Sequence, residues 1–366
     1  MICVITSSHF SDDERVYYKQ IKTLIDSGRK VLYITAFELH ETLSHPKINH
    51  IKISLDNGIN SFIKNANNQL KDYNSIDHLQ IHEPELLPII KLQKMINPKL
   101  NTIYDVHENI YAMMKTFSKR NTFITELNII RKKIVERYYL KYVNKIILAN
   151  SPLESNYYNS FKGGIYVVEN FPEKARLIKS YSTRKHDSLI YHGHLGPERG
   201  ISELISALNI LLKKHPTIHL TIIGTFRLEE YKEKIFKLID ELKLKDNVKI
   251  LNQIKHEDIW KFLKDNSIGV IPFNSNPLTM NNTPTKLFEF MSSGCSIVSS
   301  DLKPIKHYVD ETVYWAIPGD IESLSKAIDK CIKNTNNSFK INNNLKLISK
   351  IYNWDNNKQK FIKVFS

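Results

Sequence analysis

The sequence is poor in cysteine and has no long apolar run. Its three cysteines, Cys3, Cys295 and Cys331, lie far apart and lack the spacing of metal ligands, so we expect reduced, structural thiols. No apolar stretch is long enough to span a bilayer. The amino terminus, M-I-C-V-I-T, has no basic leader and is typical of a first strand. These absences favour a cytoplasmic protein without a secretory signal.

Acidic residues are too few to balance the basic ones. The 366 residues include 52 lysines and arginines against 38 aspartates and glutamates, which gives a net charge of +14 at pH 7. Anionic lipid, nucleic acid or a phosphorylated substrate would each complement this excess. Because the sequence holds no aromatic-basic repeat and no known nucleic-acid motif, we expect no nucleic-acid partner.

Residues 119–145 concentrate basic side chains among phenylalanine, isoleucine, leucine and tyrosine. This composition is typical of an amphipathic helix that lies in a membrane surface. An ordinary surface helix, with its apolar side packed on the core, would have the same composition. The sequence leaves both interpretations open.

Strand and helix patterns alternate along a chain that is long enough for two domains. Strands are expected at residues 2–6, 30–35, 51–55, 78–82, 102–106, 145–149 and 166–169, and, after a polar linker at 173–187, at 188–191, 219–223, 248–251, 268–272, 296–299 and 313–316. Helical patterns lie between most of them, among them 14–27, 85–95, 201–215, 228–242, 256–266 and 321–334. The pattern predicts an α/β fold of two Rossmann-like, doubly wound parallel sheets in series.

Residues 283–300 are expected to form a short helix followed by a buried strand. Thr283 is a candidate N-cap, Pro284 suits the first helical position, and Gly294 is placed for a left-handed C-cap. Glu289 is an acid on an otherwise apolar helix, and two neighbouring sugar hydroxyls would match its two oxygens. The helix start and Lys286 would favour a phosphate. Together they predict a nucleotide pocket, although a solvated surface position would also explain Glu289.

Ligands of open parallel sheets bind at the carboxyl ends of the strands, and this rule selects four loops. They are residues 7–13, 82–85, 107–109 and 193–200. The last loop has glycines that allow close approach of a ligand and Arg199, which can hold phosphate oxygens. It is not a G-x-G-x-x-G fingerprint, and a plain turn with a surface arginine is the alternative. Its expected position beside the Glu289 helix favours the phosphate site.

Two histidines, His82 and His107, follow expected strands of the first domain. They would hydrogen-bond a sugar or transfer a proton, or have a structural role. The chain has no Asp-x-Asp pair and no H-E-x-x-H spacing, so we expect no metal.

Several motifs, in order along nearly the whole chain, resemble those of family 4 of the nucleotide-sugar glycosyltransferases. They are residues 13–16 (D-E-R-V), 28–31 (G-R-K-V), 81–88 (I-H-E-P-E-L-L-P), 104–108 (Y-D-V-H-E), 169–172 (E-N-F-P), 193–200 (G-H-L-G-P-E-R-G), 222–224 (I-I-G), 284–294 (P-T-K-L-F-E-F-M-S-S-G) and 352–355 (Y-N-W-D). The resemblance implies the GT-B fold, in which two Rossmann-like domains face each other across a cleft. Residues 1–175 would form the acceptor-side domain and 176–351 the nucleotide-sugar domain, with the helix in 352–366 crossing back to the first.

The same resemblance implies a retaining transfer of a hexose or amino sugar from a UDP- or GDP-sugar, without a metal or another cofactor. Arg199 and Lys286 would stabilise the diphosphate, Glu289 would bind the ribose, and His107 would contact the transferred sugar. The expected catalytic residues are therefore His107, Arg199 and Lys286. The expected donor-binding residues are Gly193, His194, Arg199, Gly224, Lys286, Leu287 and Glu289.

The acceptor implied by the resemblance is a glycan, in particular a lipid-linked glycan of capsule, O-antigen or other surface-polysaccharide synthesis. The enzyme would then work in the cytoplasm at the inner face of the membrane, with anionic lipid as a further partner. The sequence departs from the family in Asn281, which replaces a second acid, in His194, which replaces an arginine, and in residues 7–10, which replace a Gly-Gly pair. The alternative is a sugar-nucleotide 2-epimerase of the same fold, whose additional acids and histidines we do not find in the second domain.

Overall fold

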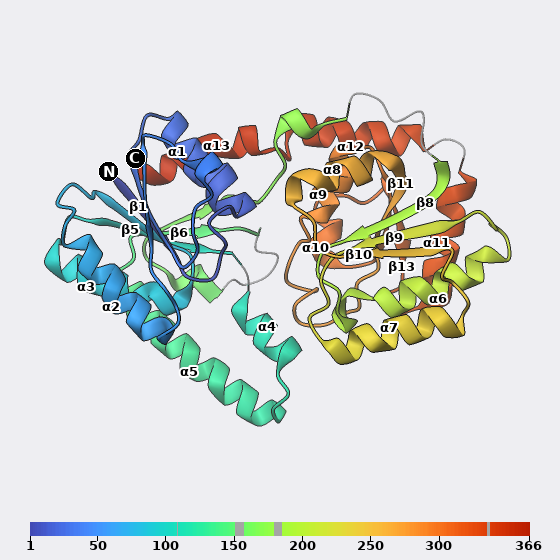
Figure 1. The fold of residues 1–366 in the computed structure, drawn as a ribbon, viewed down its shortest axis with the longest axis horizontal. Coiled ribbons are helices and arrows are strands. Elements are labelled where there is room, and N and C mark those ends of the chain that lie inside the picture. The colour runs from blue at the N-terminus through green and yellow to red at the C-terminus, as the bar shows by residue number, and fades with distance from the viewer. Residues whose placement is uncertain (108, 151–156, 179–184, 335–336) are drawn as a thin grey trace. The chain divides into compact units, whose positions relative to one another are not determined.

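The computed structural model describes all residues except 108, 151–156, 179–184 and 335–336. The described chain forms two compact units (Figure 1). Unit 1 comprises Met1–Asn170 and Trp354–Ser366, and unit 2 comprises Phe171–Asn353. The chain therefore enters unit 2 five residues before the expected boundary at 175, and its last helix belongs to unit 1.

Unit 1 is built on a parallel sheet of seven strands in the order β3-β2-β1-β4-β5-β6-β7. The strands are β1 (Ile2–Thr6), β2 (Val31–Thr35), β3 (Ile48–Lys52), β4 (His78–Ile81), β5 (Asn101–Val106), β6 (Lys145–Leu148) and β7 (Gly164–Val167). Central strands such as β1 are buried on both faces, which is why they appear as continuous apolar runs. The third and seventh strands begin earlier than expected, because both are half-exposed edge strands with polar or small residues at their starts.

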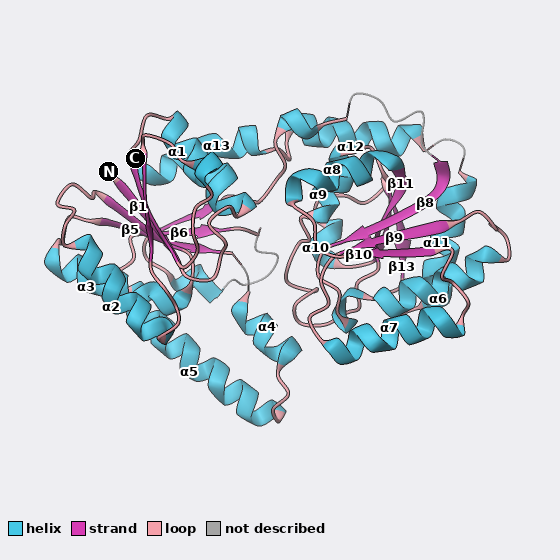
Figure 2. Ribbon diagram, viewed as in Figure 1, coloured by secondary structure: helices cyan, strands magenta, loops and turns pink. Residues whose placement is uncertain are grey.

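Helices cover both faces of this sheet (Figure 2). They are the segment Glu14–Ile21 continued by α1 (Lys22–Asp26), α2 (Gly58–Leu70), α3 (Leu87–Ile96), α4 (Ile110–Phe117), α5 (Thr122–Leu140) and α13 (Trp354–Ile362). One core contains Cys3 and Ile5 of β1 with side chains of α2 and α3, and the other contains Ile2 and Val4 with side chains of α1 and α13. The alternation of β1 residues between two cores is what a doubly wound sheet requires.

The closing helix α13 is held in unit 1 by Trp354. The indole is fully buried, and its Nε1 donates a hydrogen bond of 3.1 Å to Thr23 Oγ1. Phe361, which lies about two turns further along α13, is also fully buried in the same core. The last residues of the chain thus complete a core that its first residues begin.

Unit 2 repeats the plan with six parallel strands in the order β10-β9-β8-β11-β12-β13. The strands are β8 (Lys185–His192), β9 (His219–Ile223), β10 (Val248–Leu251), β11 (Asn266–Ile271), β12 (Ser296–Ser300) and β13 (Val313–Ala316). The helices are α6 (Ile201–Leu212), α7 (Glu229–Glu241), α8 (His256–Asp265), α9 (Lys286–Ser292), α10 (Lys303–Lys306), α11 (Ile321–Lys333) and α12 (Ser338–Lys350). Strand β8 begins inside the expected linker, where Lys185 pairs with Asn266 of β11. The prediction of two Rossmann-like parallel sheets is confirmed.

None of the helices in the described part of the chain is both long and apolar enough to cross a membrane. All three cysteines are buried thiols.

Candidate active site

The carboxyl edge of the unit 2 sheet brings together the residues that the sequence selected. The loop 193–200 follows β8, Gly224 follows β9, and α9 begins beyond the end of β11. A Cβ atom on Gly193 would lie 3.1 Å from Lys286 Nζ, and one on Gly224 would lie 1.9 Å from the carbonyl oxygen of Gly193. Loops from two strands and the start of α9 therefore meet at one place.

Gly200 closes the loop after β8 in a conformation that other residues rarely adopt. Its φ is +67°, and a Cβ atom would lie 1.8 Å from the carbonyl oxygen of Pro272. The short turn Pro197–Arg199 precedes it, and α6 begins directly after it. The glycine therefore sets the direction in which Arg199 leaves the turn.

Two cations, Lys286 and Arg199, lie over the same aromatic ring. Lys286 Nζ is 5.0 Å from the ring centroid of Phe273 and 3.7 Å from that of Tyr191, and Arg199 Cζ is 4.7 Å from the Phe273 centroid. Burial and then the charge of Arg199 hold the pKa of Lys286 well below its usual value. An anion bound beside both cations would relieve their repulsion and favour the protonated lysine.

The position of Arg199 is fixed by an acid that the sequence analysis did not single out. Glu198 is buried, and its Oε1 lies 3.3 Å from Arg199 Nε and 3.9 Å from Arg227 Nη1. The signal was available, since Glu198 precedes Arg199 in the loop 193–200. Arg227 could not have been found in this way because it comes from the loop after β9.

His194, expected to take part in donor binding, lies at the same edge but differs from the arginine it replaces. Burial, and then the charges of Arg227 and Arg199, lower its pKa to about 4. The imidazole is therefore neutral at pH 7 and adds no positive charge. Arg199 and Lys286 are therefore the residues expected to bind an anionic ligand at this site.

Glu289 is buried, 6% exposed, in contact with two histidines. Its Oε1 lies 2.6 Å from Nε2 of His256, the first residue of α8, and its Oε2 lies 3.2 Å from Nε2 of His192, the last residue of β8. The interpretation of Glu289 as a solvated surface acid is thus wrong. Burial lowers the pKa of His192 to about 4 despite the nearby carboxylate, so His192 is neutral at pH 7.

Sequence reasoning missed both histidines. His192 ends the first strand of unit 2, and His256 starts a helix that follows β10. The rule that selected loops at strand ends would have pointed to either residue. The sequence holds no sign, however, that both contact Glu289.

The start of α9 differs from the prediction. The helix begins at Lys286, with Thr285 at the N-cap position, and Thr283 Oγ1 donates to the carbonyl oxygen of Pro304 over 3.2 Å. The N–H groups of Phe288 and Glu289 donate to Thr285. Gly294 has the predicted left-handed conformation, with φ of +64°.

Leu287, for which donor binding stays a prediction, is the second residue of α9. Its side chain is fully buried in the unit 2 core, and its N–H donates to the carbonyl oxygen of Pro284 over 3.1 Å. Asn281, which stands where an acid was expected, donates from its side chain to the carbonyl oxygen of Pro277 over 2.6 Å. It stabilises the turn before α9.

In unit 1, His82 and His107 meet at the carboxyl edge of neighbouring strands, as the sequence indicated. His82 Nδ1 lies 2.6 Å from His107 Nε2, and Asp105 Oδ2 is 3.6 Å and 3.5 Å from these two atoms. Burial, and then His107, holds the pKa of His82 well below its usual value. His107 keeps partial exposure, so it is the member of the cluster that can reach a ligand.

The ligand atoms of His82, Asp105 and His107 lie within 4.8 Å of one another, close enough to raise the question of a metal. Asp105 is already paired with Arg15, whose Nη2 lies 2.9 Å from Asp105 Oδ1, and Gln20 donates to the other carboxylate oxygen. The two imidazoles are hydrogen-bonded to each other. A cation would have to displace a guanidinium partner here, so these residues fit a metal poorly.

The loop after β1, where the family has a Gly-Gly pair, binds the side chain of Glu83, which follows β4. Its buried carboxylate accepts hydrogen bonds from the N–H groups of Ser7 and Ser8, over 3.0 Å and 3.2 Å, and from Thr6 Oγ1 over 2.5 Å. The adjacent ring of His9 lies 4.3 Å from that of His107. This loop therefore presents His9, rather than free backbone amides, beside His107.

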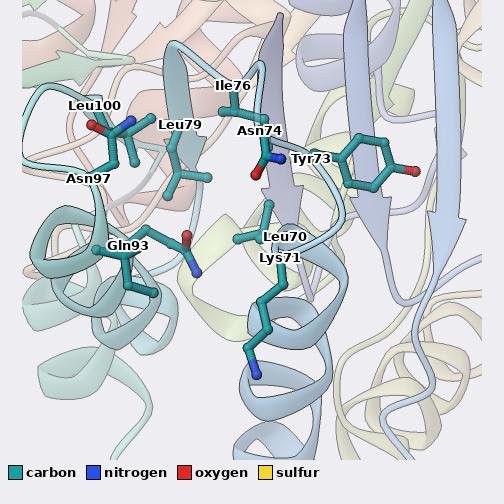
Figure 3. A pocket seen from close by; sticks show the side chains of 10 residues that line it. Leu70, Lys71, Tyr73, Asn74, Ile76, Leu79, Gln93, Asn97 and Leu100 are labelled. Atoms are coloured by element: carbon teal, nitrogen blue, oxygen red, sulfur yellow. The ribbon is translucent and has the colours of Figure 1, made fainter.

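A pocket of about 240 Å³ lies elsewhere in unit 1 (Figure 3). Residues at the ends of α2 and α3, among them Leu70 and Ile96, line it together with Leu79 of β4. Leu79 is the second residue of its strand, so the pocket lies toward the amino end of the sheet. It is not part of the candidate site.

Residues 174–348 match the family model of glycosyl transferases group 1. An uncharacterized glycosyltransferase from Haemophilus influenzae is 25% identical over 171 residues, which cover 46% of this chain and 46% of that protein. The match thus spans about half the length of this curated relative.

Solved structures that are similar over the whole chain include a sucrose-phosphate synthase and HepE. Sucrose-phosphate synthase from Thermosynechococcus elongatus has a TM-score of 0.77 at 16% identity, with coverage of 100% of this chain and 98% of that one. HepE from Anabaena, in complex with UDP and glucose, has a TM-score of 0.75 at 16% identity, with coverage of 100% and 98%. At such identities the likeness establishes the fold, which is GT-B.

Proposed function

We propose that this chain, which has the GT-B fold and a group 1 glycosyl transferase domain at residues 174–348, is a retaining glycosyltransferase. It would move a hexose or amino sugar from a UDP- or GDP-sugar to a glycan acceptor. The observation that carries the proposal is the meeting of Glu289, Lys286 and Arg199 at the carboxyl edge of the unit 2 sheet. A carboxylate for ribose hydroxyls and two cations for a diphosphate are what a nucleotide sugar needs.

The proposed chemistry depends on charge at the leaving group. As the bond to the sugar breaks, negative charge grows on the diphosphate, and Arg199 and Lys286 stabilise it in an enclosed site. Burial and the charge of Arg199 lower the pKa of Lys286, and a bound diphosphate would raise it again and favour the protonated side chain. We propose that these cations act in place of a metal ion.

His107 of unit 1 is the proposed contact for the transferred sugar, and a phosphate oxygen of the donor is the proposed acceptor of the incoming hydroxyl's proton. The partial exposure of His107 and its bond to the buried His82 support this role, since His82 holds the ring in one orientation. His107 would then be a catalytic residue that positions the sugar rather than a general base.

We further propose a lipid-linked acceptor in the synthesis of capsule, O-antigen or another surface polysaccharide, at the cytoplasmic face of the cell membrane. The net charge of +14 supports an anionic partner. The HepE structure, which holds UDP and glucose, supports a uridine nucleotide as the first donor to test.

A thermal-shift screen over UDP- and GDP-sugars tests the donor. One nucleotide sugar at about 100 times its Kd should stabilise the protein by about 2.7 kcal/mol. The stabilisation should be absent from Glu289→Ala and Arg199→Ala. Equal stabilisation of both variants and the parent protein would place the donor elsewhere.

The alternative of a sugar-nucleotide 2-epimerase gains one observation from the structure. His192 and His256 beside Glu289 supply histidines that the sequence analysis did not find in the second domain. Incubation of the donor without acceptor separates the two activities. An epimer would favour this alternative, and slow hydrolysis would favour the transferase.

A further inference from the structure

Helix α5 exposes a broad apolar face. Phe123 is 70% exposed, Ile134 64%, Ile130 52% and Leu127 50%. These positions follow one another at steps of three or four residues, so they lie on one side of the helix. Tyr138 continues this side for a further turn and is also exposed.

The opposite side of α5 packs on unit 1. Thr125, Ile129 and Glu136 are buried, and the helix contacts α3 and α4. Figure 1 shows α5 as an outer helix of unit 1, away from the sheet. The helix is therefore apolar on two sides, although the core needs only one. One side packs on the core, as in an ordinary surface helix, and the other is uncovered within unit 1, so the membrane-surface interpretation of residues 119–145 stays a prediction.

Basic side chains flank the exposed apolar face. Lys132 is paired with Glu85, whose Oε1 lies 3.5 Å from its Nζ, but Arg131, Arg137 and Lys141 are exposed beside the apolar face. The two acids of the helix do not offset them, because Glu126 Oε1 lies 2.7 Å from Lys115 Nζ, and buried Glu136 accepts hydrogen bonds from Tyr111 and Tyr158. The exposed side thus combines an apolar stripe with uncompensated positive charge.

We propose that α5 docks in the surface of an anionic lipid membrane. Phe123, Leu127, Ile130 and Ile134 enter the boundary between headgroups and acyl chains, and the basic residues beside them meet lipid phosphates. The proposal deepens the proposed function by naming the surface on which a lipid-linked acceptor would be reached, but it is argued from α5 alone. A second copy of the chain is a poorer occupant, because pairing two such faces would bring their Arg131 and Arg137 together.

The test is flotation of the full chain with vesicles of phosphatidylcholine alone or of phosphatidylcholine with phosphatidylglycerol. Binding should need the anionic lipid and should weaken as salt rises. The double variant Leu127→Ser/Ile134→Ser should bind about 10-fold less, since it removes apolar groups that enter the membrane. Arg131→Gln/Arg137→Gln should also bind less and should lose most of the salt dependence.

Phe339→Ser, which changes a 63% exposed aromatic residue of unit 2, is the matched control and should bind as the parent protein does. Binding that ignores lipid charge, or that survives the apolar double variant, would overturn the proposal. So would a concentration-dependent dimer that the same double variant abolishes, because a second copy would then be the occupant of the face.

The closing measurement separates this proposal from the proposed function. The apolar double variant should keep its stabilisation by nucleotide sugar, which also reports that unit 2 is folded, and circular dichroism should report unchanged helix content. Glu289→Ala should float as the parent protein does. If the apolar double variant loses flotation but keeps donor binding, the docking role of α5 is supported. If the parent protein floats but no nucleotide sugar stabilises it, the transferase proposal is rejected and the docking proposal is not.

Discussion

Glu289 and His256 are joined by a hydrogen bond of 2.6 Å between Oε1 and Nε2, although 33 positions separate them in the sequence. The same oxygen is the proposed acceptor for a ribose hydroxyl. His256 lies at the first position of α8 and keeps 38% of its side-chain surface exposed, so it has room to turn away. A bound nucleoside would therefore share or replace the contact with His256.

His256→Ala should strengthen donor binding by about 3- to 10-fold, the range that corresponds to the net contribution of one ordinary competing hydrogen bond. The gain should appear in Kd, measured by calorimetric titration of the nucleotide, with kcat nearly unchanged. His219→Ala, at the amino end of β9, is the control. Weaker donor binding in His256→Ala would mean that the imidazole holds Glu289 in its working position instead.

Arg199→Ala should lower kcat at least about 10-fold, because a lost donor at a charged leaving group costs a few kcal/mol in the transition state. Arg199→Lys should restore part of the rate, since it keeps the charge but loses the planar fork. Lys214→Ala, an exposed cation of unit 2, is the control in a steady-state assay of sugar release. Normal turnover in Arg199→Ala would remove the loop 193–200 from the mechanism.

Much of this site could be predicted because strand ends can be recognised in sequence. Apolar runs locate β8 and β9, and the carboxyl-edge rule then places Gly193 beside the Glu289 helix, whereas Gly224 was implied by the family resemblance alone. Contacts between elements that are distant in sequence leave no such pattern. The hydrogen bond between Glu289 and His256 and the ion pairs of Glu198 with Arg199 and Arg227 are such contacts.

The errors have tertiary causes as well. Thr283 has the side chain of a good cap, but α9 starts two residues later, after Thr285, and the Thr283 hydroxyl donates to the carbonyl oxygen of Pro304, which is distant in sequence. Edge strands β3 and β7 were placed too late, because half-exposed strands do not need unbroken apolar runs. The serines after β1 look free in sequence, yet their amides hold Glu83, which lies 75 positions beyond Ser8.

His192 should make the protein less stable in acid. Its pKa is about 4 in the folded state, below the usual 6.5, so only the unfolded chain takes up this proton as the pH falls from about 6.5 to 4. Stability should therefore drop over that window by up to about 3 kcal/mol from this group. Scanning calorimetry of His192→Asn should show a shallower decline, whereas His45→Asn, at an exposed position, should follow the parent protein. Parallel curves for His192→Asn and the parent would contradict the burial of a neutral imidazole.

Gly200→Ala should disturb the site more than Gly28→Ala. Both glycines have positive φ, +67° and +89°, but only at Gly200 would a Cβ meet backbone, 1.8 Å from the carbonyl oxygen of Pro272. The conformational strain alone costs about 1 kcal/mol at either position, and the clash at Gly200 adds to it. Urea unfolding should rank the two variants in this order, and Gly200→Ala should also lose donor affinity because the turn that carries Arg199 must move. If both variants lose the same stability, the close approach to Pro272 has no energetic weight.

Trp354→Ala should destabilise unit 1 even though the residue lies near the end of the chain. The indole is fully buried, donates to Thr23 and packs in the same core as Val4, Tyr17 and Phe361. Its removal leaves a cavity and an unpaired Thr23 hydroxyl, for which we expect a loss of about 3–5 kcal/mol. Trp315→Ala, at a partly exposed position of β13, should cost much less. Hydrogen exchange measured by mass spectrometry should show faster exchange in the segment Glu14–Asp26 of Trp354→Ala, with unit 2 protected as before. Loss of Trp354 should loosen α13 and, with it, the core of unit 1 that α13 shares with β1. Equal acceleration of exchange in both units would therefore contradict the assignment of α13 to unit 1.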